Sequence, residues 1–337
     1  MRQNLHSELL NLDPGEVDAT GEWLFRTEEP DNALLRSLER CGQLEPVLVV
    51  QDKGRYRLCT GYKRWSGCRT LGAPLLAREV QADAVHRARL NLQANLPSRI
   101  EEAALVKAAR FFHGSSREGE AADVEAELAG LLHAKRLKTL LAWLVLPLAF
   151  DRHLEACRIP FEAGPILAQC DAEELSALEP LFAELRWSKR RAEQFLSWLL
   201  ETSRRDGVGL DELVERRRML DLSRSDLAPK DRLERLAAEA RALRYPELTA
   251  IEAEFGAFQR EVARSGHWRL EADQSFETDR VLLQARLGSP GELEQAGEEL
   301  RRLLESKLMD RLRRWQKERL NVREQGDQLN GTHTNSH

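Results

Sequence analysis

The chain has 337 residues, of which 42% are hydrophobic and 32% charged, and its formal net charge is −5. This length allows two or three domains with separate cores, while the mild negative charge excludes a uniformly basic nucleic-acid coat but not local basic faces. The longest apolar stretch, 140–150, is interrupted by Pro147 and is shorter than the roughly 20 residues of a membrane span. The start of the chain lacks the order of a secretory signal, so we expect a cytoplasmic protein without a membrane partner.

The five cysteines are scattered and form neither a C-x-x-C pair nor a pattern with paired histidines. This spacing indicates neither a zinc site nor a disulfide framework. We therefore expect reduced, mostly buried thiols and no metal site.

The N-terminal third predicts two regions. Residues 1–20 are polar and without periodicity, which is typical of a flexible arm. Residues 21–97 are predicted to form a small α+β domain with a leucine-faced helix that ends at Gly42. Two strand-like runs then flank "QDKG", a hairpin signal, and a helix over 62–71 and the strand "LLAREV" follow.

The middle of the chain, 98–203, predicts only helices. Ser98 and Glu101 form a capping box that begins the first of them. The stretch "DVEAELAGLLHAKRLKTLLAWLVLP" is typical of two helices around a turn, and the second carries leucines at the spacing of a buried stripe. Short helices continue from there to about residue 203.

The remainder is more charged. Residues 204–325 predict a mostly helical C-terminal region with a β-hairpin at 268–286 and a last helix that Ser289, Pro290 and Glu292 open. That helix is expected to extend to about residue 323 and to pack on another element or subunit. The final segment, 326–337, is predicted to be a disordered tail.

The stretch "TGYKRWSGCRTLG" places two cations in the first turn of a helix, where the helix dipole disfavours them. The glycine permits close backbone approach, the helix start offers free N–H donors, and Lys63 and Arg64 add charge. This combination suits a phosphate. The alternative is that both side chains point into water or pair with Glu45 or Glu79.

Two stretches carry a resemblance to a known family. The first is "LLRSLERCGQLEPVLVVQDKGRYRLCTGYKRWSGCRTLG", and the second is the helical region that ends in "LLAWLVLP" and is followed by "EACRIPFEAGPILAQ". In order and spacing they resemble the ParB-like family of chromosome and plasmid partition proteins. The resemblance implies an α+β N-terminal domain of the ParB/sulfiredoxin-like type, followed by mostly α-helical domains that include a helix-turn-helix.

The resemblance also implies a nucleotide site. The family's G-E-R-R box, which cradles the phosphates of CTP, corresponds to Gly61, Tyr62, Lys63 and Arg64. Its second box, E-N-x-x-R, falls on residues 90–94, where only Asn91 is retained. Leucine cannot bind magnesium, which takes oxygen ligands, and alanine cannot pair with a phosphate. CTP with magnesium is therefore an expected cofactor only by resemblance, the pocket is degenerate, and CTP hydrolysis is not predicted.

Sulfiredoxin shares this small domain and uses a cysteine in a G-C-H-R motif, which draws attention to Cys68. The register argues against that role, because the matching stretch begins at Gly61 and places Tyr62 at the nucleophile's position. We expect Cys68 to face the core.

Two basic clusters form the DNA-binding hypothesis. The helix-turn-helix would consist of a first helix over 124–132 and a recognition helix that begins near Lys135 and has its leucines towards the core. The expected contacts with phosphates or bases are Lys135, Arg136, Lys138 and Thr139. The turn is about two residues shorter than the usual family pattern. The alternative is a helical scaffold with a solvated basic edge.

A second cluster follows the predicted N-cap Ser188. It consists of Lys189, Arg190 and Arg191, which DNA phosphate would stabilise. Pairing with Glu184 or Glu193 is the alternative.

These observations predict a nucleoid-associated, DNA-binding protein in plasmid or chromosome partition or in transcriptional control. By analogy with the family we expect a homodimer and a partition ATPase as partners. The rival interpretations are a CTP-hydrolysing or nuclease enzyme and a protein-interaction scaffold. No cluster of carboxylates or histidines of the kind a nuclease needs stands out in the sequence, and no catalytic residue is predicted.

Overall fold

The computed structural model describes residues 8–95, 101–117, 124–264, 266–272, 281–307, 309–312 and 314–315. The protein is mixed α/β and divides into two compact units, Met1–Ala240 and Arg241–His337. The predicted boundary after residue 203 is wrong, because helices beyond it pack on helices before it in the first unit. Among the described helices, none has the length and apolar character that a membrane crossing requires.

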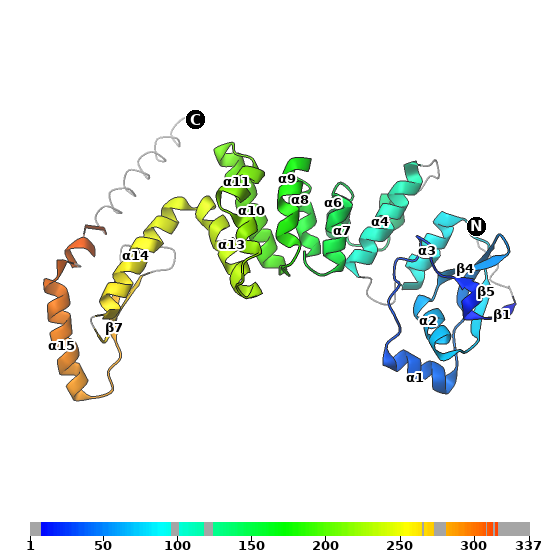
Figure 1. Ribbon diagram of the computed structural model, residues 1–337, viewed down its shortest axis with the longest axis horizontal. Helices are drawn as coiled ribbons and strands as arrows, with labels where there is room; N and C mark the ends of the chain where they lie inside the picture. The colour runs from blue at the N-terminus through cyan, green and yellow to red at the C-terminus, as the bar shows by residue number, and fades with distance from the viewer. Residues whose placement is uncertain are drawn as a thin grey trace, which may run out of the picture. The chain divides into compact units, whose positions relative to one another are not determined.

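A five-stranded mixed sheet organises the N-terminal part of the first unit (Figure 1). Its strands lie in the order β1-β5-β3-β4-β2, and β3 pairs antiparallel with β4 and parallel with β5. The elements are β1 (Leu9–Leu12), η1 (Pro14–Glu16), β2 (Val17–Asp18), α1 (Asn32–Cys41), β3 (Val47–Asp52), β4 (Arg55–Thr60), α2 (Tyr62–Leu71), β5 (Leu75–Glu79) and α3 (Ala84–Asn95).

Local sequence signals explain most of this domain. Gly42 ends α1 in a left-handed-region conformation (φ 70°), as predicted. Lys53 and Gly54 both have positive φ, which is the backbone that a two-residue hairpin turn of type I′ requires. Neighbouring residues of β3, Val49 and Val50, point to opposite faces and are both buried, so the sheet is covered on both sides.

The prediction of a flexible arm over 1–20 is wrong for its described part. Strand β1 pairs with β5, and β2 pairs with β4. β1 is an edge strand with the sequence LLNL, whose residues alternate between exposed and half-buried. The sequence hides this alternation, because three of the four residues are leucine. The place of β1 depends on backbone pairing and on Trp65 of α2, whose indole N–H donates to the carbonyl of Pro14 at 2.9 Å.

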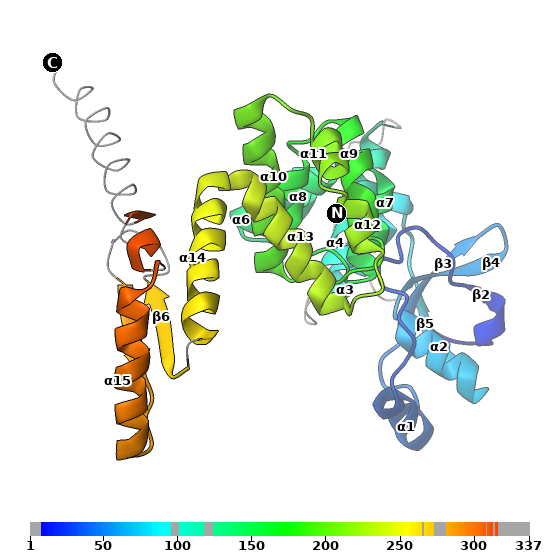
Figure 2. The ribbon, with the colours of Figure 1, turned by 60° about the vertical axis from the view of Figure 1, so that its left-hand side comes forward.

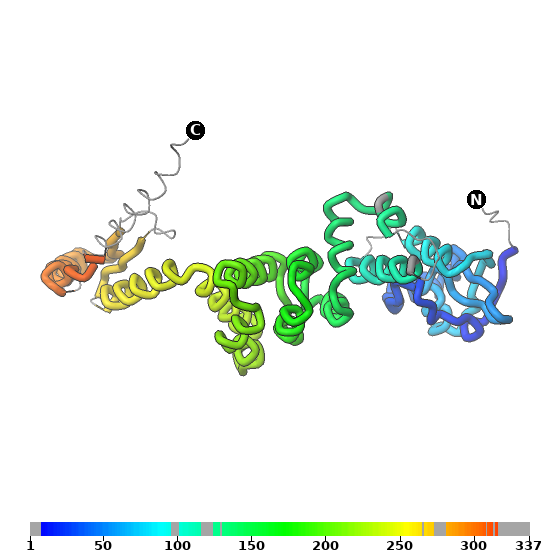
Figure 3. The backbone as a smooth tube through the Cα atoms, turned by 90° about the horizontal axis from the view of Figure 1, so that it is seen from above, coloured from blue at the N-terminus to red at the C-terminus, as the bar shows by residue number. Residues whose placement is uncertain are grey.

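Helices make up the rest of the first unit, with α-helices of 4 to 18 residues drawn from turquoise to yellow-green in Figure 3. Both helices that carry the predicted basic clusters, α6 and α10, pack against the short segment formed by η2 and α8. The elements are α4 (Glu102–Arg117), α5 (Val124–Ala129), α6 (Ala134–Trp143), α7 (Leu148–Glu155), η2 (Phe161–Ala163), α8 (Gly164–Leu167), α9 (Ala172–Leu178), η3 (Glu179–Phe182), α10 (Lys189–Asp206), α11 (Leu210–Arg216), α12 (Met219–Ser223) and α13 (Pro229–Arg244).

The second unit contains α14 (Pro246–Arg264), β6 (Trp268–Ala272), β7 (Val281–Ala285) and α15 (Pro290–Glu305). Strands β6 and β7 pair antiparallel within the segment where the sequence predicts a hairpin, and Figure 2 shows β6 beside α14 and α15.

The last predicted helix is interrupted at Ser306. Beyond that residue, Leu312 and Trp315 enter a core with Phe255 and Phe258, so this segment packs within its own unit. The helix expected up to residue 323 and the tail at 326–337 extend beyond the described residues.

Candidate phosphate-binding and nucleic-acid sites

The start of α2 is built around Gly61, which adopts the left-handed region (φ 89°) as the N-cap. Its carbonyl accepts the N–H groups of Arg64 and Trp65, each at 3.0 Å. A Cβ on Gly61 would lie 2.7 Å from Cγ1 of Val47 in β3. Glycine is therefore needed both for the backbone angle and for the close approach of strand and helix. The first N–H groups of the helix, those of Tyr62 and Lys63, have no acceptor within the helix.

The two cations of this turn already have partners. The Lys63 ammonium lies 2.6 Å from the Glu28 carboxylate, and Arg64 lies 3.2 Å from the carboxylate of Glu45. Arg64 also donates to the carbonyls of Glu45 and Pro46, at 3.0 and 3.3 Å. The pairing with Glu45 is the one that the alternative interpretation named. Arg64 thus fastens the loop before β3 to α2, whereas Lys63 holds a half-exposed carboxylate that a phosphate can replace at little cost.

The residues at the predicted second nucleotide box are part of the fold. Asn91 is buried, and its side-chain amide donates to the carbonyl of Cys59 at 2.8 Å. Leu90 packs on the cluster that includes Val50 and Cys59. Asn91 therefore supports the end of β4, just before Gly61. The ring centre of Tyr62 lies 5.2 Å from that of Trp65.

All five cysteines are free thiols. Cys68 is buried as predicted, its sulfur lies 3.6 Å from the side-chain oxygen of Gln43, and burial raises the pKa of its thiol. Cys41 and Cys157 are exposed, so the expectation of mostly buried thiols is wrong for those two. Within the described residues, no group of three or more His, Cys, Asp or Glu side chains is placed to hold a metal ion.

Helix α6 has one apolar and one basic face. Leu137, Leu140 and Trp143 are buried, whereas Lys135 and Lys138 are exposed. In the part of the chain that the structure describes, these two lysines have no carboxylate within 4 Å. Arg136 is 3.8 Å from Glu102 of α4, and the Thr139 hydroxyl donates to the carbonyl of Lys135 at 3.1 Å. Leucine spacing alone therefore identified the exposed lysines.

The start of α10 is basic as well. Ser188 is the N-cap, but its side chain makes no capping hydrogen bond to the described residues. Lys189 lies 2.7 Å from Glu162 of η2, and Arg191 lies 3.4 Å from Glu234 of α13. These carboxylates differ from the two that the sequence suggested. Arg190 is exposed.

The segment η2–α8 packs against both α6 and α10. The Trp143 indole of α6 stacks on Phe161 with ring centres 6.2 Å apart, and its N–H donates to the Phe161 carbonyl at 2.9 Å. A Cβ on Gly164 would lie 2.4 Å from the indole nitrogen, so only glycine fits there. Because α10 packs against the same segment, Lys189 and Arg136 both act on Glu162.

That electrostatic contact is visible in the pKa of Glu162. Burial raises the pKa, but the hydrogen bond from Lys189, a backbone hydrogen bond and the charge of Lys189, with a smaller contribution from Arg136, together outweigh burial and hold the pKa below its ordinary value. Glu102 acts in turn on Lys189, as well as pairing with Arg136. The two helix starts are therefore joined by four alternating charges.

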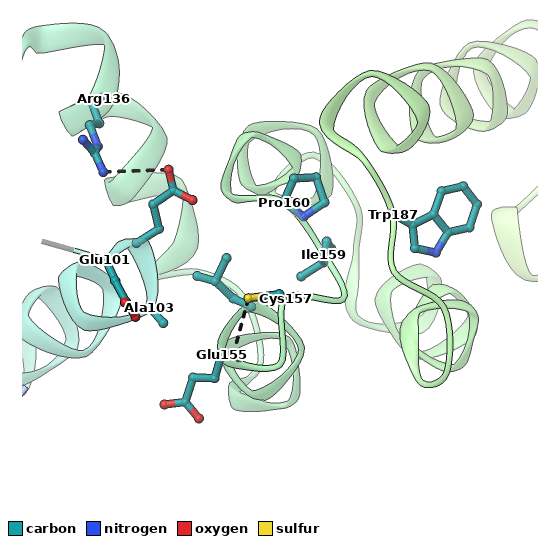
Figure 4. A pocket seen from close by; sticks show the side chains of 10 residues that line it. Glu101, Ala103, Arg136, Glu155, Cys157, Ile159, Pro160 and Trp187 are labelled. Carbon is teal, nitrogen blue, oxygen red and sulfur yellow. Dashed lines mark hydrogen bonds and ion pairs between the residues drawn. The ribbon is translucent and has the colours of Figure 1, made fainter. Parts of the chain in front are cut away.

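A cavity of about 470 Å³ lies beside this network (Figure 4). Arg136 lies at the edge of the cavity and pairs with Glu102. The buried side chains of Leu154, Ile159 and Trp187 form an apolar wall. The exposed thiol of Cys157 also lines it. The cavity therefore has an apolar wall and a charged rim, and residues of α4, α6 and α7 line it.

Sequence reasoning did not identify Arg110 of α4, which fixes the other end of α6. Its guanidinium pairs with Asp151 of α7, with one N···O distance of 2.9 Å. It also donates to the carbonyls of Trp143 and Leu146, at 3.0 and 2.8 Å. Arg110 therefore donates to the last carbonyl of α6 and to a carbonyl of the turn that follows, near the helix end where carbonyls lack donors within the helix. No local pattern marks this role, because the partners lie more than 30 residues away.

Comparisons with known proteins gave structural neighbours only. No family model matches the chain, and no curated protein matches it in sequence. Among solved structures, the chain is similar to the C-terminally truncated chromosome-partitioning protein ParB from Caulobacter crescentus complexed to the centromeric parS site, at a TM-score of 0.33 and 12% identity. That match covers 56% of this chain and 98% of the ParB chain.

A second solved structure is the C-terminally truncated ParB from Caulobacter crescentus complexed with CTP-gamma-S. Its TM-score is 0.25 and its identity 16%, with coverage of 52% of this chain and 99% of the other.

Proposed function

We propose that the protein is a ParB-like DNA-binding protein, in which the face formed by α6 and the start of α10 contacts duplex DNA. The observation that carries the proposal is the pair of exposed lysines on α6, Lys135 and Lys138, opposite a buried leucine face. Helices α5 and α6 act as the helix-turn-helix, with α6 in the major groove. The adjoining start of α10, with Arg190 exposed, adds phosphate contacts.

The role that follows is partition of a plasmid or chromosome, or transcriptional control. Both require site-specific binding, and both are consistent with a basic helix whose opposite face is fixed by the core. A partition role would add a partner ATPase and a nucleoid location. The second unit supports self-association as a homodimer in this proposal, because Leu282, Leu293 and Leu304 are exposed on β7 and α15.

The salt dependence of DNA binding tests the proposal. Each lysine that contacts phosphate releases about one counterion, so Lys135→Ala/Lys138→Ala should flatten the plot of log affinity against log salt by about two units. The matched control is Arg36→Ala/Arg40→Ala, which removes the same charge from exposed positions of α1. An unchanged slope in the α6 variant, or an equal change in the control, contradicts the proposed interface.

The second part of the proposal concerns the nucleotide pocket at the start of α2. The start of α2 offers two N–H groups and Lys63 to a phosphate. Residues 90–94 offer magnesium only neutral side chains, and one of these, Asn91, already donates a hydrogen bond to the Cys59 carbonyl. We therefore propose a degenerate CTP pocket that binds phosphate without catalysing hydrolysis. Calorimetry of CTP binding with and without magnesium tests this. Tight, magnesium-dependent binding with turnover would favour the rival CTPase function.

A further inference from the structure

The carboxylate of Glu162 sits between the two basic helix starts. It lies 2.7 Å from the Lys189 ammonium, and the charge of Arg136 also lowers its pKa. The backbone at Glu162 is held in place, because the neighbouring Phe161 stacks on the Trp143 indole and accepts a hydrogen bond from it. Its side chain is 34% exposed, so a ligand on this face can reach it.

We propose that Glu162 competes with DNA phosphate for the cations of the α6–α10 face and so weakens sequence-independent binding. The inference rests on the proposed function. It assigns to Glu162 a role in limiting phosphate contacts, distinct from the roles of the lysines that contact DNA.

The physical basis is the division between backbone and base contacts. Phosphate contacts supply affinity that is nearly independent of sequence, whereas base contacts supply discrimination. When a phosphate approaches Lys189, the Glu162 carboxylate must lose its partner and remain near the new negative charge. This cost applies to every DNA sequence, so Glu162 lowers the affinity for random DNA without adding any base contact. Because specificity is a difference of affinities, a cost common to all sequences lowers total affinity and leaves discrimination to the base contacts.

The exposed lysines of α6 can bind DNA even though Glu162 holds Lys189. Lys135 and Lys138 are exposed, so their phosphate contacts require no carboxylate to be displaced. Lys189 and Arg136, by contrast, are held by Glu162 and Glu102 at 2.7 and 3.8 Å. The α6–α10 face thus contains two exposed lysines and two cations that are paired with carboxylates.

The test uses the full-length protein and a short duplex of random sequence, with affinity measured by fluorescence anisotropy between about 50 and 200 mM salt. The variants are Glu162→Gln, which removes the charge, and Glu162→Asp, which keeps it. The matched control is Glu155→Gln, because Glu155 lines the same cavity but pairs with Lys107 of α4. Thermal unfolding checks that all variants are folded.

We expect Glu162→Gln to bind random DNA about two- to fivefold more tightly, the range for an exposed ion pair. Its salt slope should be steeper by about one unit, because Lys189 becomes free to contact phosphate. Glu162→Asp should bind like the wild type, and so should Glu155→Gln. Acylation of Lys189, read by mass spectrometry without DNA, should be faster in Glu162→Gln only.

The outcomes separate this inference from the proposed function. If the wild type binds DNA and Glu162→Gln has the same affinity and slope, the role of Glu162 is wrong while DNA binding stands. If Glu155→Gln tightens binding equally, net charge is the cause and the specific role is also wrong. If neither the wild type nor any variant binds at low salt, both proposals are wrong.

Discussion

Two helix starts in the first unit, those of α2 and α6, hold their basic side chains in opposite ways. At α2, Arg64 is bound by a carboxylate and two backbone carbonyls, and Lys63 by Glu28. At α6, Lys135 and Lys138 lie exposed on the face opposite the core. The same kind of sequence pattern therefore produces a fold contact in one place and an open cationic surface in the other.

The difference shows what decides whether a basic cluster is available to a polyanion. At α2, the loops before β3 and before α1 bring carboxylates and carbonyls to the helix start. At α6, among the described residues, Arg136 meets a carboxylate of α4, whereas Lys135 and Lys138 meet none. A cation whose partners are internal contributes to affinity only after those partners are displaced. The following variants test how firmly each contact belongs to the fold.

The largest expected effect is at Arg110, which extends the comparison to a cation that is bound entirely within the fold. Arg110→Met should lower the free energy of unfolding by about 3–5 kcal/mol, because it leaves the Asp151 carboxylate, whose side chain is only 16% exposed, without its partner. Burial already raises the pKa of Asp151 despite the Arg110 hydrogen bonds. Urea unfolding followed by tryptophan fluorescence measures the loss. Arg110→Met/Asp151→Leu should recover most of it, and a double variant as unstable as the single one would show that the pair is not the cause.

A smaller effect is expected at Gly61, where the fold forms the α2 start. Gly61→Ala should cost about 2–4 kcal/mol, the sum of a left-handed alanine and of overpacking against Val47. Gly72, which ends the same helix, provides the matched control, because it has φ 62° and open space around its Cα. Gly72→Ala should cost only about 1–2 kcal/mol from the backbone. Equal losses in urea unfolding would mean that close approach to β3 is unimportant.

The next effect concerns Asn91, which supports the end of β4 below this helix start. Asn91→Ala should cost about 1–3 kcal/mol, because the buried carbonyl of Cys59 loses its donor. Gln93→Ala, at an exposed position of the same helix, should change stability by less than about 0.5 kcal/mol. A loss of phosphate binding by Asn91→Ala without a loss of stability would instead assign Asn91 to a ligand.

The sequence was most informative where local chemistry determines the backbone. The glycines that end α1 and α2 and the positive-φ turn between β3 and β4 could all be read from residue type. Edge strand β1 could not, because three of its four residues are leucine, which hides the alternation, and its pairing is long-range. The unit boundary was also missed, since contacts among α9, α10 and α11 leave no mark on composition.

The candidate sites divide in the same way. Leucine spacing on α6 predicted which lysines point away from the core. The carboxylates that meet Lys63 and Lys189 could not be predicted, because Glu28, in the loop before α1, and Glu162, in η2, lie 35 and 27 residues away along the chain (63 − 28 and 189 − 162). Distant loops position side chains through tertiary packing, which has no period in the sequence.

The smallest expected effect is at Glu28, and it measures how loosely the α2 start holds its lysine. The Arg26 hydrogen bond is the largest influence that lowers the pKa of Glu28, and Lys63 adds to it. A carboxyl whose folded pKa lies below its unfolded value of 4.5 stabilises the fold above that pH. The contribution is lost as pH falls through the folded pKa.

Glu28→Gln should therefore lower stability at neutral pH by less than about 1 kcal/mol, since the pair is partly exposed and solvent screens it. The difference from the wild type should vanish towards low pH, where Glu28 is protonated in both states. Urea unfolding at a series of pH values measures this, with Glu39→Gln on α1 as the control for loss of one exposed carboxylate. A difference that persists at low pH would mean that the Glu28 side chain acts through packing, and the ammonium of Lys63 would then be no more restrained than the lysines of α6.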